Sequence, residues 1–193
     1  MKAMTSEASM LIYFLLPLFI MTIGFEFSRQ IYKNPLSSGM SRLNYFISKY
    51  LVFIIVAFSQ FVFYYFFVFI AGGIKNGFGH ASGTFVGKFA GTVGIQFVEI
   101  NAIFAITVLV MYLFFSTITA VVTTIILPMI LTVVIDILYK HEWLHKFSFQ
   151  NNIDNAYFAT YSNSALFQLI LVGLGTIAVC TILAYLTFRK RDL

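Results

Sequence analysis

The chain has 193 residues, of which 60% are hydrophobic and only 10% are charged, and its formal net charge is +5. Soluble domains contain about 25% charged residues, so this composition excludes an ordinary soluble protein and indicates a single membrane domain, residues 1–193. No glycine-rich phosphate-binding motif occurs, so we expect that the chain does not hydrolyse a nucleotide. The basic residues lie beside apolar runs, which favours membrane orientation over nucleic-acid binding as their role.

Long uncharged runs predict an all-α polytopic membrane protein with about five transmembrane helices. A run of about 18 or more apolar residues can cross a hydrocarbon core roughly 30 Å thick as a helix, which satisfies its own backbone hydrogen bonds. The expected spans are Met10–Phe25, Phe46–Ala71, Val93–Phe115, Thr119–Tyr139 and Ala165–Phe188.

The segment between the first two spans, residues 26–49, has the pattern of a short helix on the membrane surface. Charged residues alternate there with four apolar ones, Ile31, Tyr32, Leu36 and Met40. Gly39 can end such a helix in the left-handed conformation, and Ser41 can cap the next helix. Pro35 predicts an interruption, because the residue before a proline is biased away from the helical region.

The middle of the chain predicts one loop and one tight turn. Several glycines between residues 72 and 92 indicate a flexible loop. The uncharged stretch Ile100–Ile135 is too long for one ordinary helix, so we expect two helices joined at Ser116-Thr117.

Glu99 is the most informative residue within a predicted span. A carboxylate inside a membrane is costly and usually faces a cavity or a partner, which makes Glu99 a candidate for a substrate path, together with the aromatic residues Phe63 and Phe67. Because Glu99 lies about two turns from the expected external end, the alternative is a structural carboxylate that reaches solvent or is hydrogen-bonded within the protein. Close approach of another helix is expected at three small residues, Gly173, Gly175 and Ala178.

His141, Glu142 and His145 form an H-E-x-x-H sequence, the signature of zinc peptidases. Asp154 is the only nearby external carboxylate, and two flanking lysines would oppose metal binding. The sequence also lies at a span end, where His and Trp are ordinary interfacial residues. We therefore expect a short external amphipathic segment and no metal site, with a membrane zinc peptidase as the alternative function.

Basic residues near the span ends favour a cytoplasmic 27–49 loop and a cytoplasmic C-terminus. Seven lie on that side: Arg29, Lys33, Arg42, Lys49, Arg189, Lys190 and Arg191. Five lie on the other side: Lys2, Lys75, Lys88, Lys140 and Lys146. This orientation places the N-terminus outside.

Several short motifs follow one another in an order that points to a known family. They are Glu26 at a span end, Ile31-Tyr32-Lys33-Asn34, Leu36, Gly39, Ser41-Arg42, Ser48-Lys49 and the closing Phe188-Arg189-Lys190-Arg191-Asp192. In this order they resemble the ABC-2 type transporter permeases, particularly the small ones associated with peptide export or peptide-antibiotic resistance. The likeness covers nearly the whole chain in span order, and it implies a six-span fold that lacks its first span here.

The resemblance implies the transmembrane subunit of an ATP-driven exporter in the bacterial cell membrane, with no catalytic residue and no cofactor of its own. A separate ABC ATPase subunit would hold ATP and Mg, and a second permease chain would complete the transporter. The expected substrate is a hydrophobic or amphipathic peptide. A membrane protein that binds a toxin without transporting it, as immunity proteins do, is a further alternative.

The resemblance also implies that the 26–49 segment contains a cytoplasmic coupling helix, which docks on the ATPase. Six residues would take part in that coupling: Glu26, Ile31, Tyr32, Lys33, Leu36 and Arg42. Lys33 and Arg42 are expected to pair with acidic groups of the partner. Glu26 is expected to pair with Arg29 or Arg42 and so to set the angle at which the loop leaves the span.

Overall fold

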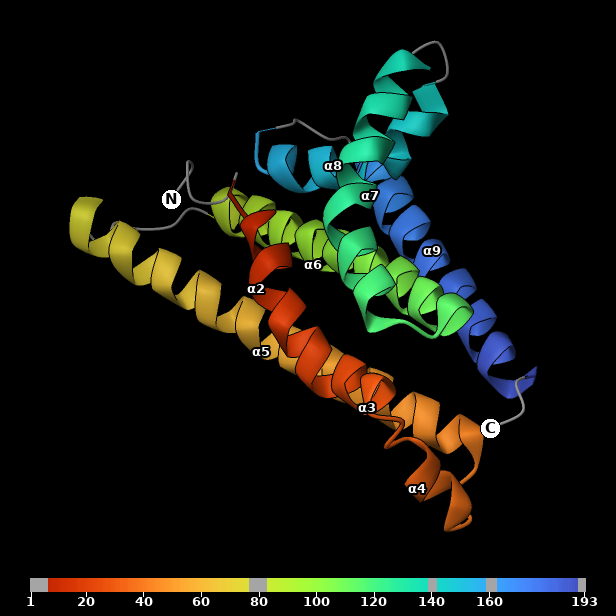
Figure 1. Cartoon of the computed structure of the whole chain (residues 1–193). Coiled ribbons are helices and arrows are strands. Elements are labelled where there is room, and N and C mark those ends of the chain that lie inside the picture. Colours follow the sequence, from red (N-terminus) through yellow and green to blue (C-terminus); the bar gives the residue numbers. More distant parts are fainter. Residues whose placement is uncertain (1–6, 77–82, 139–141, 159–162, 191–193) are drawn as a thin grey trace.

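The computed structural model describes residues 7–76, 83–138, 142–158 and 163–190, which form helices and turns without a strand. The helices in chain order are α2 (Met10–Phe19), η1 (Ile20–Gly24), α3 (Phe25–Ser28), α4 (Lys33–Ser37), α5 (Arg42–Asn76), α6 (Gly83–Phe114), α7 (Thr117–Ile137), η2 (Glu142–Phe147), α8 (Phe149–Asn155) and α9 (Asn163–Lys190) (Figure 1). Within this part of the chain, five helical segments are long and apolar enough to cross a membrane. The predicted helical fold with five segments of membrane-spanning length is confirmed.

The first span, Met10–Ser28, consists of α2, η1 and α3 in continuous succession. Pro17 lies inside α2 and lacks a backbone donor, and the π-helical segment η1 begins three residues later. The Thr117 hydroxyl of α7 donates to the Gly24 carbonyl of η1 at 2.9 Å. A Cβ atom at Gly24 would lie 2.7 Å from Cγ2 of Thr117, so this close contact with α7 requires glycine.

Helices α5 and α6 are longer than the sequence predicts. They contain 35 and 32 residues, or roughly 50 Å each at 1.5 Å per residue, against a hydrocarbon core of about 30 Å. The predicted loop at 72–92 is therefore wrong over most of its length, because α5 continues through Gly72 and Gly73 and α6 begins at Gly83. Glycine is common in membrane helices, where it does not interrupt the helix as it does in water. The remainder of that prediction, 77–82, lies outside the described residues.

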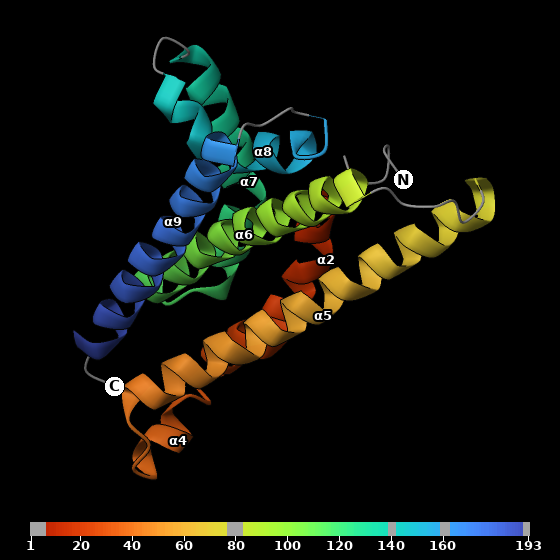
Figure 2. The ribbon, with the colours of Figure 1, turned by 180° about the vertical axis from the view of Figure 1, so that it is seen from behind.

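Helix α6 occupies the centre of the molecule. Figures 1 and 2 show α7, α8 and α9 grouped around it, with α2 and α5 forming a second layer. Its most apolar window is 61% buried, against 22–39% for the other four spans. A Cβ atom at Gly173 of α9 would lie 2.5 Å from Cγ1 of Val98 on α6. The predicted close approach therefore occurs at Gly173, whereas Gly175 and Ala178 are exposed.

The turn between α6 and α7 lies where the sequence predicts it. Phe115 has a φ of 51° and ends α6 in the left-handed region. The Ser116 hydroxyl then accepts the backbone N–H of Thr119 at 3.3 Å and caps α7.

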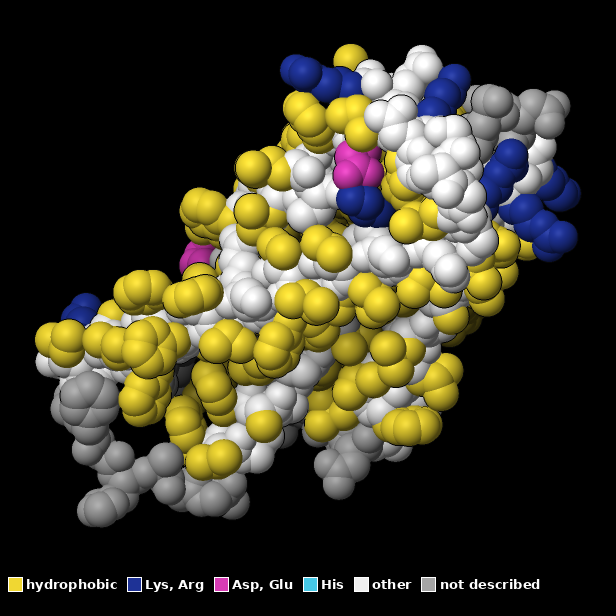
Figure 3. Space-filling view, turned by 90° about the horizontal axis from the view of Figure 1, so that it is seen from below, with side chains coloured by type: hydrophobic (Ala, Val, Ile, Leu, Met, Phe, Trp, Pro, Cys, Tyr) yellow, Lys and Arg dark blue, Asp and Glu magenta, His cyan; other side chains and the backbone are white. Residues whose placement is uncertain are grey.

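Hydrophobic side chains cover most of the molecular surface. Figure 3 views the molecule from the end that carries α4, and the yellow hydrophobic side chains outnumber all charged ones there. Large exposed apolar residues occur on all five long segments, which is the surface expected of a protein in contact with lipid.

Candidate functional site

The α4 turn, defined here as residues 29–41, begins with a tight reversal after α3. Gln30 has a φ of 54°, and its N–H donates to the Phe27 carbonyl at 3.2 Å. The N–H of Ile31 reaches back to the Glu26 carbonyl at 2.9 Å. This pair of bonds is a Schellman motif, which satisfies the last carbonyls of α3. It fixes the direction in which the chain leaves the first span.

A second Schellman motif ends α4. The N–H of Met40 donates to the Pro35 carbonyl at 3.0 Å, and that of Gly39 to the Leu36 carbonyl at 3.2 Å. Gly39 has a φ of 97°, and the Ser41 hydroxyl accepts the N–H of Asn44 at 3.2 Å, so both predicted caps are confirmed. The predicted interruption at Pro35 is wrong, because proline is the third residue of α4 and no intrahelical donor is needed in the first turn.

Tyr32 packs into the protein and not outward. Its side chain is 6% exposed, and its ring stacks on Phe27 with the two centroids 4.9 Å apart. Phe27 in turn contacts Tyr112 of α6, at a centroid distance of 4.6 Å, and Tyr112 lies 5.2 Å from Phe188 of α9. The resemblance places Tyr32 among the residues that couple to the ATPase, but in the structure its ring is an internal anchor of the α4 turn.

Glu26 links α3 to α5 through two hydrogen bonds. The Tyr45 hydroxyl donates to one carboxylate oxygen at 2.7 Å, and Lys49 Nζ to the other at 2.5 Å. The expected pairing of Glu26 with Arg29 or Arg42 is wrong. Tyr45 and Lys49 stand one helical turn apart on the face of α5 beside α3, whereas the Arg29 guanidinium lies 4.6 Å from the ring centroid of Phe25.

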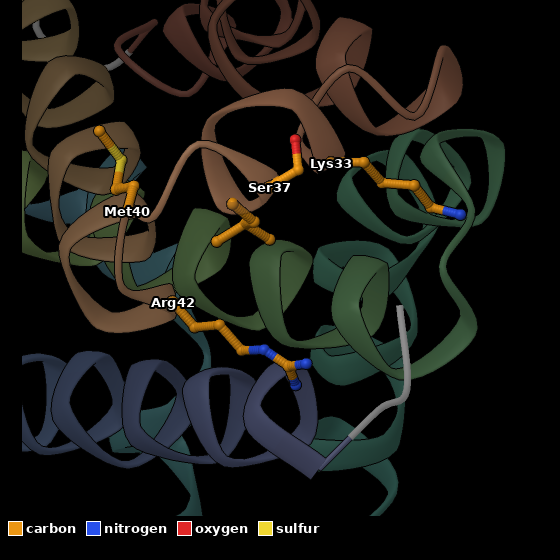
Figure 4. A pocket seen from close by; sticks show the side chains of 5 residues that line it. Lys33, Ser37, Met40 and Arg42 are labelled. Atoms are coloured by element: carbon orange, nitrogen blue, oxygen red, sulfur yellow. The ribbon is translucent and has the colours of Figure 1, made fainter.

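Arg42 caps the last span. Its guanidinium donates to the carbonyl of Arg189 at 2.6 Å and to that of Phe188 at 3.4 Å. Both carbonyls belong to the final turn of α9, which has no intrahelical donors left for them. Figure 4 shows the Arg42 side chain directed from the start of α5 toward the end of α9. Sequence reasoning missed this role, because nothing local signals a contact across 147 positions.

The outer side of the α4 turn is open. A pocket of about 420 Å³ is lined by Lys33, Leu36, Ser37, Met40 and Arg42 (Figure 4). Lys33, Ser37 and Met40 are exposed, and Leu36 is half-buried. We call these four residues the α4 surface. It combines one cation with apolar and hydroxyl groups, a combination suited to a protein partner.

A second candidate site is a buried polar stripe on one face of α6, formed by Thr92, Gln96, Glu99 and Thr107, each at most 2% exposed. Gln96 donates to the Ile153 carbonyl of α8 at 2.8 Å and accepts a hydrogen bond from the Tyr65 hydroxyl. Thr92 donates to the Ala156 carbonyl at 3.4 Å. Polar groups of α6 therefore satisfy carbonyls at the end of α8 and hold that short helix against the bundle.

Glu99 is the exception in this stripe. It is fully buried, and no hydrogen bond from the described residues reaches either carboxyl oxygen. The Asn152 side chain of α8 lies near enough to interact with it. The solvated form of the structural alternative is wrong, because α6 begins about four turns before Glu99 and its neighbours cover the side chain. The hydrogen-bonded form stays a prediction, with Asn152 as its nearby donor.

The structure does not bring Glu99 together with Phe63 and Phe67. Both phenylalanines lie on the outer side of α5 and are 64% exposed. Phe63 lines a groove with Phe14 and Pro17 of α2, and Phe67 lines another near the start of the chain.

The H-E-x-x-H sequence falls partly outside the described residues, because His141 lies there. Residues Glu142–Phe147 form the 3-10 helix η2, in which residues four apart point in directions about 120° apart. Across the described ranges, no group of three or more His, Cys, Asp or Glu residues could hold a metal ion. The predicted short segment between the last two spans is present as η2 and α8.

Burial raises the pKa of the Asp154 carboxyl group on α8 above its usual value.

Comparison with known proteins yields one match. Residues 3–193 match the model of a family described as "Protein of unknown function (DUF2705)". Neither a curated protein nor a solved structure matches the chain.

Proposed function

We propose that this chain, which belongs to the DUF2705 family, is the transmembrane subunit of an ATP-driven exporter. It pairs with a separate ATPase subunit that holds ATP and Mg, and with a second permease chain, in the bacterial cell membrane. The chain itself performs no covalent chemistry. It supplies the substrate path, for a hydrophobic or amphipathic peptide, and the surface that receives the motion of the ATPase.

The observation that carries this proposal is the attachment of the α4 turn to three spans at once. Tyr32 packs on Phe27 at the end of the first span, and Ser41 caps α5 directly after the turn. The Tyr32 ring also lies against Phe188 of α9, with the two centroids 6.3 Å apart, and Arg42, the first residue of α5, holds the last carbonyls of α9. A coupling element must be stiff and must be joined to the spans that move, since a flexible loop would absorb the displacement. The α4 turn meets both requirements.

On this proposal, five of the six coupling residues take one of two roles. Lys33 and Leu36 belong to the α4 surface and contact the ATPase, together with Ser37 and Met40, which sequence reasoning did not include. Glu26, Tyr32 and Arg42 face inward and transmit the movement to α5, α6 and α9. Ile31, the sixth coupling residue, is half-buried at the start of the turn, directly before α4.

Charge reversal on the α4 surface tests the docking. In Lys33→Glu, an attractive contact at the interface becomes repulsive, and we expect the affinity for the ATPase to fall at least tenfold. Because Lys33 is exposed, the variant should unfold at the same temperature as the wild type. The measurement is pull-down of the ATPase from membranes, followed by ATP hydrolysis in reconstituted vesicles.

Lys190→Glu is the matched control. This lysine is also exposed and closes α9, near the α4 turn but outside the α4 surface, so its reversal should leave ATPase binding close to wild type. Equal binding by wild type and Lys33→Glu would refute the docking role of α4. Equal loss in both variants would show a general effect of charge at this end of the molecule.

A further inference from the structure

Two buried side chains near the contact of α6 with α8 have oxygen atoms for which no hydrogen bond of good geometry is found among the described residues. Glu99 is fully buried, and neither of its oxygens accepts a hydrogen bond from the described residues. Ser148, the residue before α8, is 2% exposed, and its hydroxyl oxygen has no partner within the same part of the chain. Native proteins rarely leave such groups unsatisfied, because each costs about 1–3 kcal/mol and a lone charge costs more.

The register of the two helices places Asn152 beside Glu99 and Ser148 one turn further along the same interface. Thr92 bonds to Ala156, Gln96 bonds to Ile153, and Glu99 interacts with Asn152, so α8 runs antiparallel to α6. Ser148 stands one turn before Asn152, and the Asn152 N–H donates to the Ser148 carbonyl at 2.9 Å. Ser148 therefore lies one turn beyond Asn152 in this series, at the same interface. The group formed by Glu99, Ser148 and Asn152 is called the α6–α8 site below.

The charged groups on the surrounding elements interact elsewhere. Lys88 of α6 lies over the ring of Tyr157, 5.2 Å from its centroid. Lys146 of η2 donates to Gln168 of α9 at 2.8 Å.

The other titratable groups on these elements, as far as the structure describes them, do not supply a fixed counter-charge either. Asp154 of α8 is an acid that interacts with Ser9. Three more side chains are exposed: Asp136 of α7, His145 of η2 and Glu7 before α2. No basic side chain among the described residues thus forms an ion pair with Glu99, since the one ion pair found there joins Lys49 to Glu26.

We propose that the α6–α8 site binds a monovalent cation, either a proton or a sodium ion, which is enclosed when α8 packs on α6. One carboxylate balances one positive charge, so the occupied site is neutral, as a buried site in a membrane must be. A divalent ion would need further carboxylates, and none lies on the facing side of α8. The Ser148 hydroxyl and the Asn152 amide supply the neutral oxygens that a sodium ion takes as ligands, or the acceptors that a protonated carboxyl group requires.

Cation binding then stabilises the packed position of α8. Since α8 contributes only two buried apolar side chains, Phe149 and Ile153, neutralisation of Glu99 is a large part of what holds it. Loss of the cation leaves a buried charge, which is relieved when α8 separates and water reaches the carboxylate. The site thereby links cation concentration to exposure of the polar stripe of α6.

Thermal unfolding of the purified chain in detergent tests this site without any partner, so the result is independent of the proposed exporter function. Sodium chloride is exchanged for choline chloride at constant ionic strength, at pH 6 and at pH 8. If sodium occupies the site, its addition at pH 8 should raise the unfolding temperature by about 5–10 °C when it reaches roughly 100 times its dissociation constant. If a proton occupies it, the same rise should follow the change from pH 8 to pH 6, with no effect of sodium.

Three variants assign the response to the site. Glu99→Gln has the shape of the neutral carboxyl group and should abolish either response, whereas Asp136→Asn makes the same chemical change at an exposed position and should keep it. Ser148→Ala should weaken the response to whichever cation occupies the site, because its hydroxyl serves as a sodium ligand or as an acceptor for the protonated carboxyl group. The proposal is overturned if the wild type responds to neither cation, or if Glu99→Gln responds as the wild type does.

Discussion

At the scale of single residues, the partner of a charged side chain decides what that side chain does. Glu26 and Arg42 look alike in the sequence, as charges that flank a basic loop. In the structure, Glu26 joins α3 to α5 through Lys49 and Tyr45, and Arg42 joins α5 to α9. Each connects two spans, so neither is free to serve as a docking charge, and only Lys33 keeps that role.

The Glu26–Lys49 pair gives a quantitative prediction. Both side chains are partly exposed, 23% and 29%, so solvent weakens the pair, and we expect a coupling energy of about 0.5–1 kcal/mol in a double-mutant cycle of Glu26→Gln and Lys49→Met. The same cycle with Arg42→Gln in place of Lys49→Met should give a coupling near zero. The measurement is chemical unfolding in detergent. Strong coupling to Arg42 and none to Lys49 would contradict the observed pairing.

At the scale of helices, small residues decide how closely the spans pack. Helix α9 approaches α6 at Gly173, where an added methyl group would meet Val98. Such contacts matter in lipid, because helix association there depends on close packing and not on burial of apolar surface from water. The small residues of α9 that face outward have no such role.

We therefore expect Gly173→Ala to destabilise the chain by about 1–3 kcal/mol through overpacking. Val98→Ala in the same chain should recover part of that loss, because it removes the methyl group that Cβ would meet. Gly175→Ala is the control, since nothing lies within 4 Å of a Cβ atom at that position. Thermal unfolding of the four proteins gives the comparison, and a loss at Gly175→Ala as large as that at Gly173→Ala would contradict the packing argument.

At the scale of the whole molecule, the structure places the α4 turn and the end of α9 at the same end of the bundle, which predicts that they lie on one side of the membrane. The bond from Arg42 to the Arg189 carbonyl joins them there. Helix α8 lies at the opposite end of the bundle in Figures 1 and 2. The distribution of basic residues then predicts that the side with α4 is cytoplasmic.

Cysteine labelling in intact cells measures this orientation. In a chain with Cys180 replaced by Ala, cysteines at Ser37 and Lys190 should react with a membrane-impermeant reagent only after the cells are opened, whereas a cysteine at Asn155 should react at once. All three native residues are exposed. External labelling of both Ser37→Cys and Lys190→Cys would reverse the orientation and remove the coupling proposal, and labelling from opposite sides would contradict the structure itself.

The sequence alone determined the features that depend on neighbours along the chain. Uncharged runs located the five spans, because the length of an apolar run is visible in the sequence itself and does not depend on tertiary contacts. Gly39, Ser41 and the Ser116-Thr117 turn were located by residue type, since caps and turns are local structures. The loop at 72–92 was misplaced because glycine breaks helices less in a membrane than in water.

Only the tertiary structure decided which of these residues meet. Tyr32 is buried, Arg42 caps a helix 147 positions away, and Glu99 is buried beside Asn152 of α8. A helix presents several faces, and the sequence of one helix does not specify which face a distant segment will cover. The contacts that define both candidate sites arise between segments far apart in the chain, so their geometry follows from how the helices pack.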